Sequence, residues 1–83
     1  MSPQSLNGNG YSADVRMHLS VNGQTIKIGQ MGPNFVILDD APDLAPSQGE
    51  ITMSIDGRVR RWHVSLPDGI SANRVKTRIA KPA

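Results

Sequence analysis

Two stretches of the chain alternate apolar and polar residues, and each stretch is interrupted by a two-residue turn sequence. The turn sequences are Asn22-Gly23 and Asp56-Gly57, and both dipeptides tolerate the positive φ angles of a type I′ turn. The pattern therefore predicts two β-hairpins, with strands at about 13–21, 24–28, 50–55 and 58–66.

The first hairpin has a self-consistent register, because a two-residue loop fixes which residues face each other. Closing the chain on its turn places Leu19 opposite Ile26 and Met17 opposite Ile28. The polar residues between them then point to the other side. One apolar and one polar face are what an antiparallel ribbon with one buried side requires.

The second hairpin carries positive charge on its apolar side. Closing it on its turn places Ile51 opposite Trp62 and Met53 opposite Arg60, with Arg61 on the other face. Either the hairpin tip extends beyond the core and its arginines stand in water, or a three-residue loop with a bulge shifts the register by one. We expect the overhang, because this register keeps the large apolar side chains of the hairpin together.

Three further segments complete the predicted fold. A strand is predicted at about 34–38, where Phe35 to Leu38 is continuously apolar, which indicates a central strand buried on both faces. Residues 39–49 contain two prolines and end on a glycine, and are typical of a loop between hairpins. Residues 71–80 fit a helix, since Val75 and Ile79 are four apart, or a strand, since basic and β-branched residues alternate. We predict a sixth strand with a basic outer face.

Six short strands predict an all-β fold, a small antiparallel six-stranded barrel or roll built from two hairpins, because closure removes exposed strand edges. With 83 residues there is room for one domain, which we place at residues 13–80. Residues 1–12, dominated by Ser, Pro, Gln, Asn and Gly, are expected to form a disordered leader. There are no cysteines to reinforce so small a core, and a homo-oligomer would bury more surface.

The chain has no targeting signal that we recognise. No stretch approaches the roughly 20 apolar residues of a membrane span, and the N-terminus lacks the basic region and apolar run of a signal peptide. We therefore expect a cytoplasmic protein without a membrane partner.

The order of the predicted elements resembles the six-stranded barrel of PilZ domains, over roughly residues 13–80. The shared layout is a first hairpin, a bend at residues 29–32, a buried strand, a loop ending in Gly49 and a long hairpin. PilZ domains that bind cyclic di-GMP carry Arg-x-x-x-Arg ahead of the barrel and Asp/Asn-x-Ser-x-x-Gly within it. Here the one Arg-x-x-x-Arg match runs from Arg74 to Arg78 at the opposite end, and Gly32 lacks the acid or amide and the serine before it. The resemblance implies the barrel and not the nucleotide binding.

Charge is distributed unevenly along the chain, although the net charge is only +2. Residues 57–83 hold seven Lys and Arg against one acid, and residues 1–56 hold two against six. If the second hairpin and the last strand lie side by side, their cations form one patch that attracts phosphates or an acidic protein. The alternative is a solvated basic face neutralised by the acidic loop. The candidate binding residues are Arg58, Arg60, Arg61, Trp62, Arg74, Lys76 and Arg78.

Trp62 has two interpretations. It shares a strand face with Arg58 and Arg60, a combination that single-stranded nucleic-acid grooves use for stacking and for neutralising phosphates. A lone Trp opposite Ile51 is also typical of the largest core side chain of a small domain, with Arg60 covering it through a cation–π contact.

Catalytic chemistry is not indicated. His18 and His63 lie on different hairpins, across from Lys27 and Glu50, and there is no Ser-His-acid spacing, phosphate loop or calcium loop. We expect no enzymatic activity, no metal site and no cofactor. The sequence predicts a module that binds a protein partner or acts in assembly, with nucleic-acid or nucleotide binding through the basic C-terminal face as the alternative.

Overall fold

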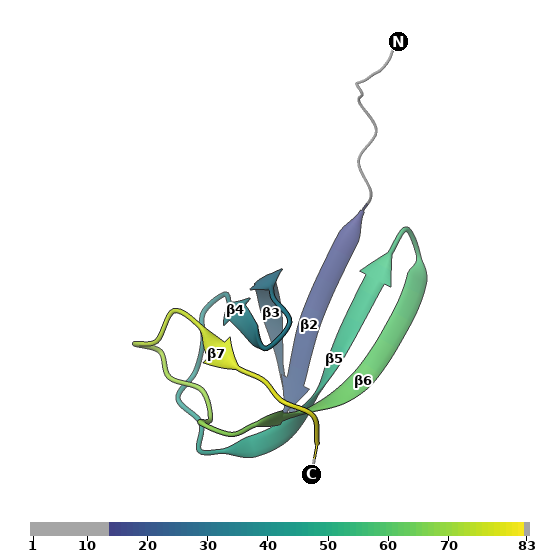
Figure 1. Ribbon diagram of the computed structural model, residues 1–83. Helices are drawn as coiled ribbons and strands as arrows, with labels where there is room; N and C mark the ends of the chain where they lie inside the picture. Colours follow the sequence, from purple (N-terminus) through teal and green to yellow (C-terminus); the bar gives the residue numbers. More distant parts are fainter. Residues whose placement is uncertain (1–13, 83) are drawn as a thin grey trace.

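The structure, a computed structural model, describes residues 14–82, and this part of the chain contains six β-strands and no helix (Figure 1). The strands are β2 (Val15–Val21), β3 (Gln24–Met31), β4 (Phe35–Leu38), β5 (Ser47–Ile55), β6 (Arg58–Leu66) and β7 (Thr77–Arg78). The predicted all-β class is confirmed. The predicted disordered leader, residues 1–12, lies outside the described residues.

All six strands form one antiparallel sheet, in the order β6-β5-β2-β3-β4-β7, that curls into a half-barrel (Figure 1). The two outer parts of the sheet meet at one point. There the Ser65 N–H donates to the Ala80 carbonyl (N···O 2.8 Å) and the Ala80 N–H donates to the Ser65 carbonyl (3.0 Å). The predicted barrel or roll is therefore a half-barrel closed by a short bridge.

Both hairpins close on the predicted turns with the predicted registers. The turn residues all have positive φ, which is 49° at Asn22, 77° at Gly23, 50° at Asp56 and 86° at Gly57. These angles are those of the type I′ turn, whose twist matches that of the flanking strands. As predicted, Leu19 faces Ile26 and Ile51 faces Trp62.

The first hairpin separates earlier than its pattern predicts. The β2–β3 ladder begins at His18 and Lys27, so the predicted Met17–Ile28 pair is not part of it. From Ile28 to Met31, β3 pairs with β4 instead, with a register shift between Ile28 and Gln30. The predicted bend at residues 29–32 is thus largely the end of a bulged strand.

Two other predicted boundaries were wrong. β5 begins at Ser47, inside the predicted loop 39–49. In the predicted sixth strand only Thr77–Arg78 pair with β4, because a turn from Ser71 to Arg74 precedes them (Arg74 N to Ser71 O 3.1 Å). The predicted central strand buried on both faces is wrong as well, because in Phe35–Leu38 only Val36 is buried and β4 lies next to the end of the sheet, beside the two-residue strand β7.

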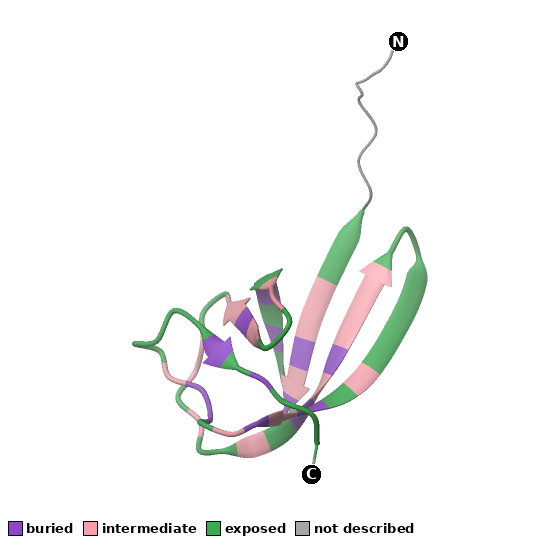
Figure 2. Ribbon diagram, in the orientation of Figure 1, coloured by how far each residue is buried: buried purple, intermediate pink, exposed green. Residues whose placement is uncertain are grey.

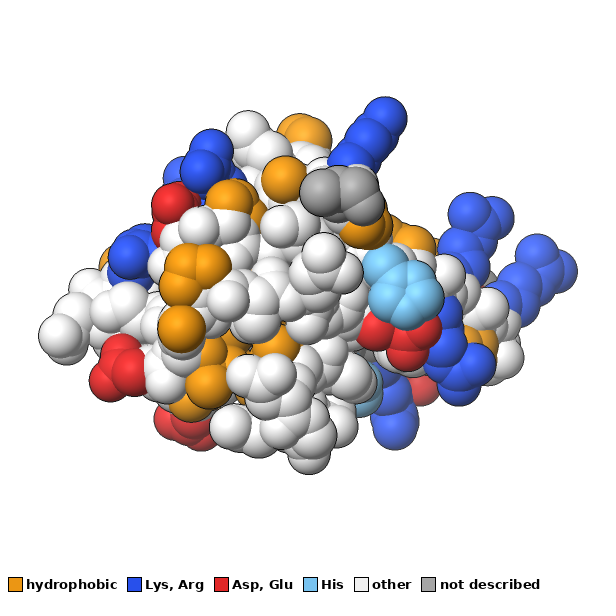
Figure 3. All heavy atoms as spheres, turned by 90° about the horizontal axis from the view of Figure 1, so that it is seen from below, with side chains coloured by type: hydrophobic (Ala, Val, Ile, Leu, Met, Phe, Trp, Pro, Cys, Tyr) orange, Lys and Arg blue, Asp and Glu red, His pale blue; other side chains and the backbone are white. Residues whose placement is uncertain are grey.

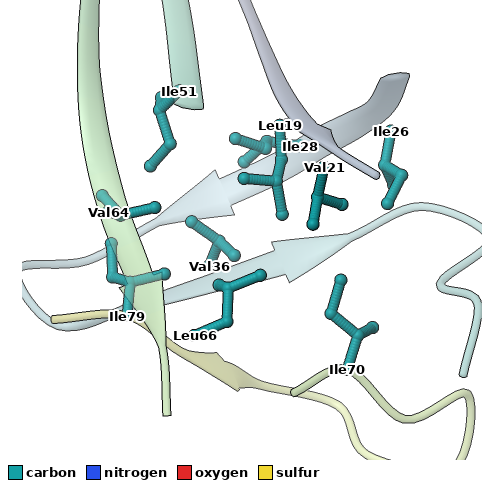
Figure 4. Packing of buried hydrophobic residues seen from close by; sticks show 10 residues of the cluster. All are labelled: Leu19, Val21, Ile26, Ile28, Val36, Ile51, Val64, Leu66, Ile70 and Ile79. Atoms are coloured by element: carbon teal, nitrogen blue, oxygen red, sulfur yellow. The ribbon is translucent and has the colours of Figure 1, made fainter. Parts of the chain in front are cut away.

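The core fills the closed end of the half-barrel, where side chains from both hairpins and from the C-terminal segment meet (Figure 4). Leu19, Ile51 and Leu66 have no exposed surface at all. The buried apolar side chains are Leu19, Val21, Ile26, Ile28, Val36, Ile51, Val64, Leu66, Ile70 and Ile79.

Beyond this core, the ends of β2, β5 and β6 around the Asp56-Gly57 turn continue as a three-stranded ribbon (Figure 1). We call this ribbon, residues 15–17, 53–55 and 58–61, the overhang. Its tip is fastened by two bonds, from the Asp14 N–H to the Asp56 carboxylate (2.9 Å) and from the Asp56 N–H to the Asp14 carbonyl (3.0 Å). Burial falls along the ribbon toward this tip (Figure 2), so the predicted overhang is confirmed.

Candidate functional site

The predicted basic patch is divided between two parts of the molecule. Arg58, Arg60 and Arg61 lie near the tip of β6, whereas Arg74, Lys76 and Arg78 lie around β7. β6 and β7 are at opposite ends of the strand order. The Ser65–Ala80 bridge joins the C-terminal segment to the last residues of β6, whereas the three β6 arginines are at the start of that strand (Figure 1). One continuous patch, which required the second hairpin and the last strand to lie side by side, is therefore not formed.

The cations around β7 already have partners within the domain. The Arg78 Nε lies 2.9 Å from the Asp68 carboxylate, and the Arg74 guanidinium donates to the Asp68 carbonyl at 3.4 Å. The Lys76 Nζ lies 4.5 Å from the centroid of the Phe35 ring. Because these contacts hold the three charges near their own chain, this group is a weak candidate for a ligand site.

The cations of β6 are divided by the alternation of the strand. Arg58 and Arg60 share the face of Trp62, and Arg61 points to the other face. Within residues 14–82 none of the three arginines forms an ion pair. Trp62 is half-buried against the core opposite Ile51, as its core interpretation predicts. The predicted cation–π contact from Arg60 is not found in the described part of the chain.

The side of the overhang that continues the core face is apolar, and no part of residues 14–82 covers it. On it, Val15 faces Ile55 and Met17 faces Met53 across the β2–β5 ladder. The exposed fractions are 49% for Val15 and 40% for Ile55, and both methionines are half-buried. A hollow of about 290 Å³ on this side is lined by Met53, Ile55, Arg58 and Arg60. We call this surface, Val15, Met17, Met53, Ile55, Arg58 and Arg60, the inner overhang face.

The opposite side of the sheet carries basic side chains that only the pairing of distant strands brings together. The registers place Arg61 opposite Thr52, Thr52 opposite His18, and His18 opposite Lys27, in one row across four strands. We call these four residues the outer row. Arg16 lies on the same side, with its Nε 3.5 Å from the Asp14 carboxylate. The row depends on the pairing of β2 with β5, which no local pattern in the sequence indicates.

A groove of about 770 Å³ opens where β2 and β3 separate. It lies beyond the last pair of the β2–β3 ladder, His18 and Lys27. Its walls mix the cations Arg16 and Lys27 with the carboxylates of Asp14 and Asp39. Charges of both signs give the groove no preference for an anion or a cation.

The histidines have structural partners, as predicted. The His63 Nε2 lies 3.7 Å from the Glu50 carboxylate in an exposed cross-strand pair, and His18 faces Lys27.

In the described part of the chain no three His, Asp or Glu residues are close enough to hold a metal ion. Figure 3 shows histidine beside acidic and basic side chains on one side of the closed end. The same part of the chain contains no helix able to span a membrane.

Comparison with known proteins gives no relative. No family model, no curated protein and no solved structure matches the chain. The resemblance to PilZ domains therefore stays a prediction.

Proposed function

We propose that this protein is a non-catalytic interaction module that docks a partner protein on the inner overhang face. The observation that carries the proposal is the exposure of Val15 (49%) and Ile55 (40%) on strands that extend past the core. A contiguous exposed apolar surface bordered by polar residues is typical of a protein-binding site.

The energetics of the overhang support this role. Ordering the backbone of a residue costs about 1–2 kcal/mol, and exposed side chains such as Val15 and Ile55 return little of it through burial. A partner that covered this face would recover about 1.5–3 kcal/mol for each large apolar side chain fully removed from water. A bound partner would therefore stabilise the ordered overhang more than the rest of the domain does.

Charge indicates what kind of partner fits. Arg58 and Arg60 border the apolar side chains and form no ion pair within the described residues. A partner with carboxylates around an apolar contact would complement them, whereas a second copy would bring the same arginines into one interface. The proposed partner is therefore a different protein with an acidic rim around an apolar patch.

Site-specific photo-crosslinking in the producing cell tests the proposal. A benzophenone amino acid replaces Ile55, and a matched control replaces Gln24, which is exposed on β3 near the opposite turn. We expect one protein to be captured at position 55 and not at 24, and its purified form to bind the domain less tightly after Arg58→Glu with Arg60→Glu. Equal capture at both positions, no adduct, or adducts between copies of this chain would contradict the proposal.

Nucleic-acid binding is the second candidate function, and the outer row is the observation that favours it. Lys27, His18 and Arg61 lie on one side of neighbouring strands, where they would follow a phosphate backbone. Single-stranded DNA titrated at low and high salt tests this function. Salt-sensitive binding that weakens in a Lys27→Glu, Arg61→Glu variant would support it, and absence of binding at low salt would remove it.

A further inference from the structure

The outer edge of β6 turns a row of backbone groups away from the sheet. In a hairpin with a two-residue turn, the flanking residues Ile55 and Arg58 exchange backbone hydrogen bonds. The backbone N–H and C=O groups of every second residue from Arg58 therefore point toward β5. The backbone groups of the residues between them point away from the sheet. Ser65 belongs to the outward set, and it exchanges two backbone hydrogen bonds with Ala80, at 2.8 and 3.0 Å. The edge of β6 is thus able to pair with an extended segment.

The C-terminal segment of the chain pairs with this edge at a single bridge, between Ala80 and Ser65. In the antiparallel register that pairs Ala80 with Ser65, Pro82 stands opposite His63. Proline has no N–H and cannot donate to the ladder. Val59, Arg61 and His63 are all exposed, and no other strand pairs with this side of β6 in residues 14–82.

We propose that the β6 edge from Val59 to His63 binds an extended acidic segment of the partner as an added strand. This inference rests on the proposed function and names the conformation and charge of the docking segment. Strand addition would satisfy the outward backbone groups of these residues. Because side chains alternate along a strand, carboxylates on one side of the segment would lie beside Arg58 and Arg60, and carboxylates on the other beside Arg61.

A second copy of the chain fits this edge poorly. An antiparallel pair of β6 strands centred on the edge would set Arg60 or Arg61 directly opposite its own counterpart. Like charges directly opposite each other destabilise a sheet, and charged edge strands are a recognised protection against self-pairing. The arginines therefore select for an acidic strand and against the chain itself.

Amide hydrogen exchange measured by NMR on the full chain tests the inference. The probe is a synthetic peptide of about nine alternating glutamate and threonine residues, with blocked ends. Near saturation we expect exchange at Val59, Arg61 and His63 to slow about tenfold. Exchange at Arg60 and Trp62, whose backbone turns toward β5, should change less than about twofold.

Two substitutions at one position separate backbone pairing from charge. Val59→Pro removes an outward N–H at an edge position where proline is tolerated, and Val59→Thr keeps it. We expect the peptide affinity to fall about fivefold with proline and to stay within about twofold with threonine. A control peptide with lysine in place of glutamate should not bind.

Absence of protection at the outward amides up to about 1 mM peptide, or equal binding of the lysine peptide, would overturn the inference. A partner captured at position 55 that keeps its affinity for the Val59→Pro variant would refute strand addition and leave the proposed function intact. A partner that loses affinity for the Val59→Pro variant but not for an Ile55→Ser variant would support strand addition and contradict docking on the inner overhang face.

Discussion

Ser65 and Ala80 exchange two backbone hydrogen bonds, with N···O distances of 2.8 and 3.0 Å, and this pair joins the two outer parts of the sheet. Three of the four residues next to them in the sequence, Val64, Leu66 and Ile79, are buried in the core, and the fourth, Lys81, is exposed. The bridge therefore closes the half-barrel at its apolar end and leaves the overhang open at the other. Stability resides at the closed end, and binding is proposed at the open one.

The first prediction tests this division with the same substitution at two positions of β5. Ile51 has no exposed surface and Ile55 is 40% exposed. Ile51→Ala should lower the free energy of unfolding by about 2–5 kcal/mol, and Ile55→Ala by less than about 1 kcal/mol. Urea denaturation of both variants measures the difference. Equal losses would mean that the overhang is part of the stabilising core.

A second comparison concerns two glycines with positive φ. Gly23 has φ +77° with open space around it, whereas Gly69 has φ +65° and an added Cβ would overlap the Leu44 carbonyl oxygen. Gly23→Ala should cost about 1 kcal/mol through backbone strain alone. Gly69→Ala should cost more, because it also displaces the Leu44–Ile70 bridge. Thermal melts that rank Gly23→Ala as the more damaging would contradict this.

Thr77 is the buried polar residue of the described core, with 1% exposure, and its hydroxyl has no hydrogen-bond partner in residues 14–82. Valine has the same shape without the hydroxyl. Thr77→Val should therefore stabilise the domain by about 1 kcal/mol, since no buried donor is left unsatisfied. Thr77→Ser, which keeps the hydroxyl and removes the methyl group, should destabilise it. A lower melting temperature for the valine variant would argue for an unrecognised partner of the hydroxyl.

Cyclic di-GMP provides the test of the PilZ resemblance. The matching Arg-x-x-x-Arg pair, Arg74 and Arg78, contacts Asp68 through its guanidinium groups and lies at the end of the chain opposite to the family's element. We therefore expect no binding at micromolar cyclic di-GMP. Saturable NMR shift changes at Arg16 and around Gly32 would contradict this expectation.

Local features of the sequence predicted the hairpins well, because Asn22-Gly23 and Asp56-Gly57 determine the turn type and a two-residue turn fixes the register. The overhang followed from that register. What the sequence could not predict depends on pairing between distant strands. The register of β3 against β4 shifts after Ile28, and the position of β7 beside β4 separates Arg78 from Arg60.

The candidate surfaces were predictable only in part for the same reason. Alternation placed Arg58 and Arg60 on one face and Arg61 on the other, and the structure agrees. The approach of β2 to β5 is non-local, and it brings Val15 beside Ile55 and His18 beside Thr52. Neither the inner overhang face nor the outer row could be assembled without that pairing.

The most direct test of the proposed docking surface is the affinity of the protein captured at position 55 for a Val15→Ser, Ile55→Ser variant. We expect the affinity to fall about tenfold or more, because two apolar contacts are lost, while the free energy of unfolding changes by less than about 1 kcal/mol per substitution. Unchanged affinity in a folded variant would contradict the account and place the binding surface elsewhere.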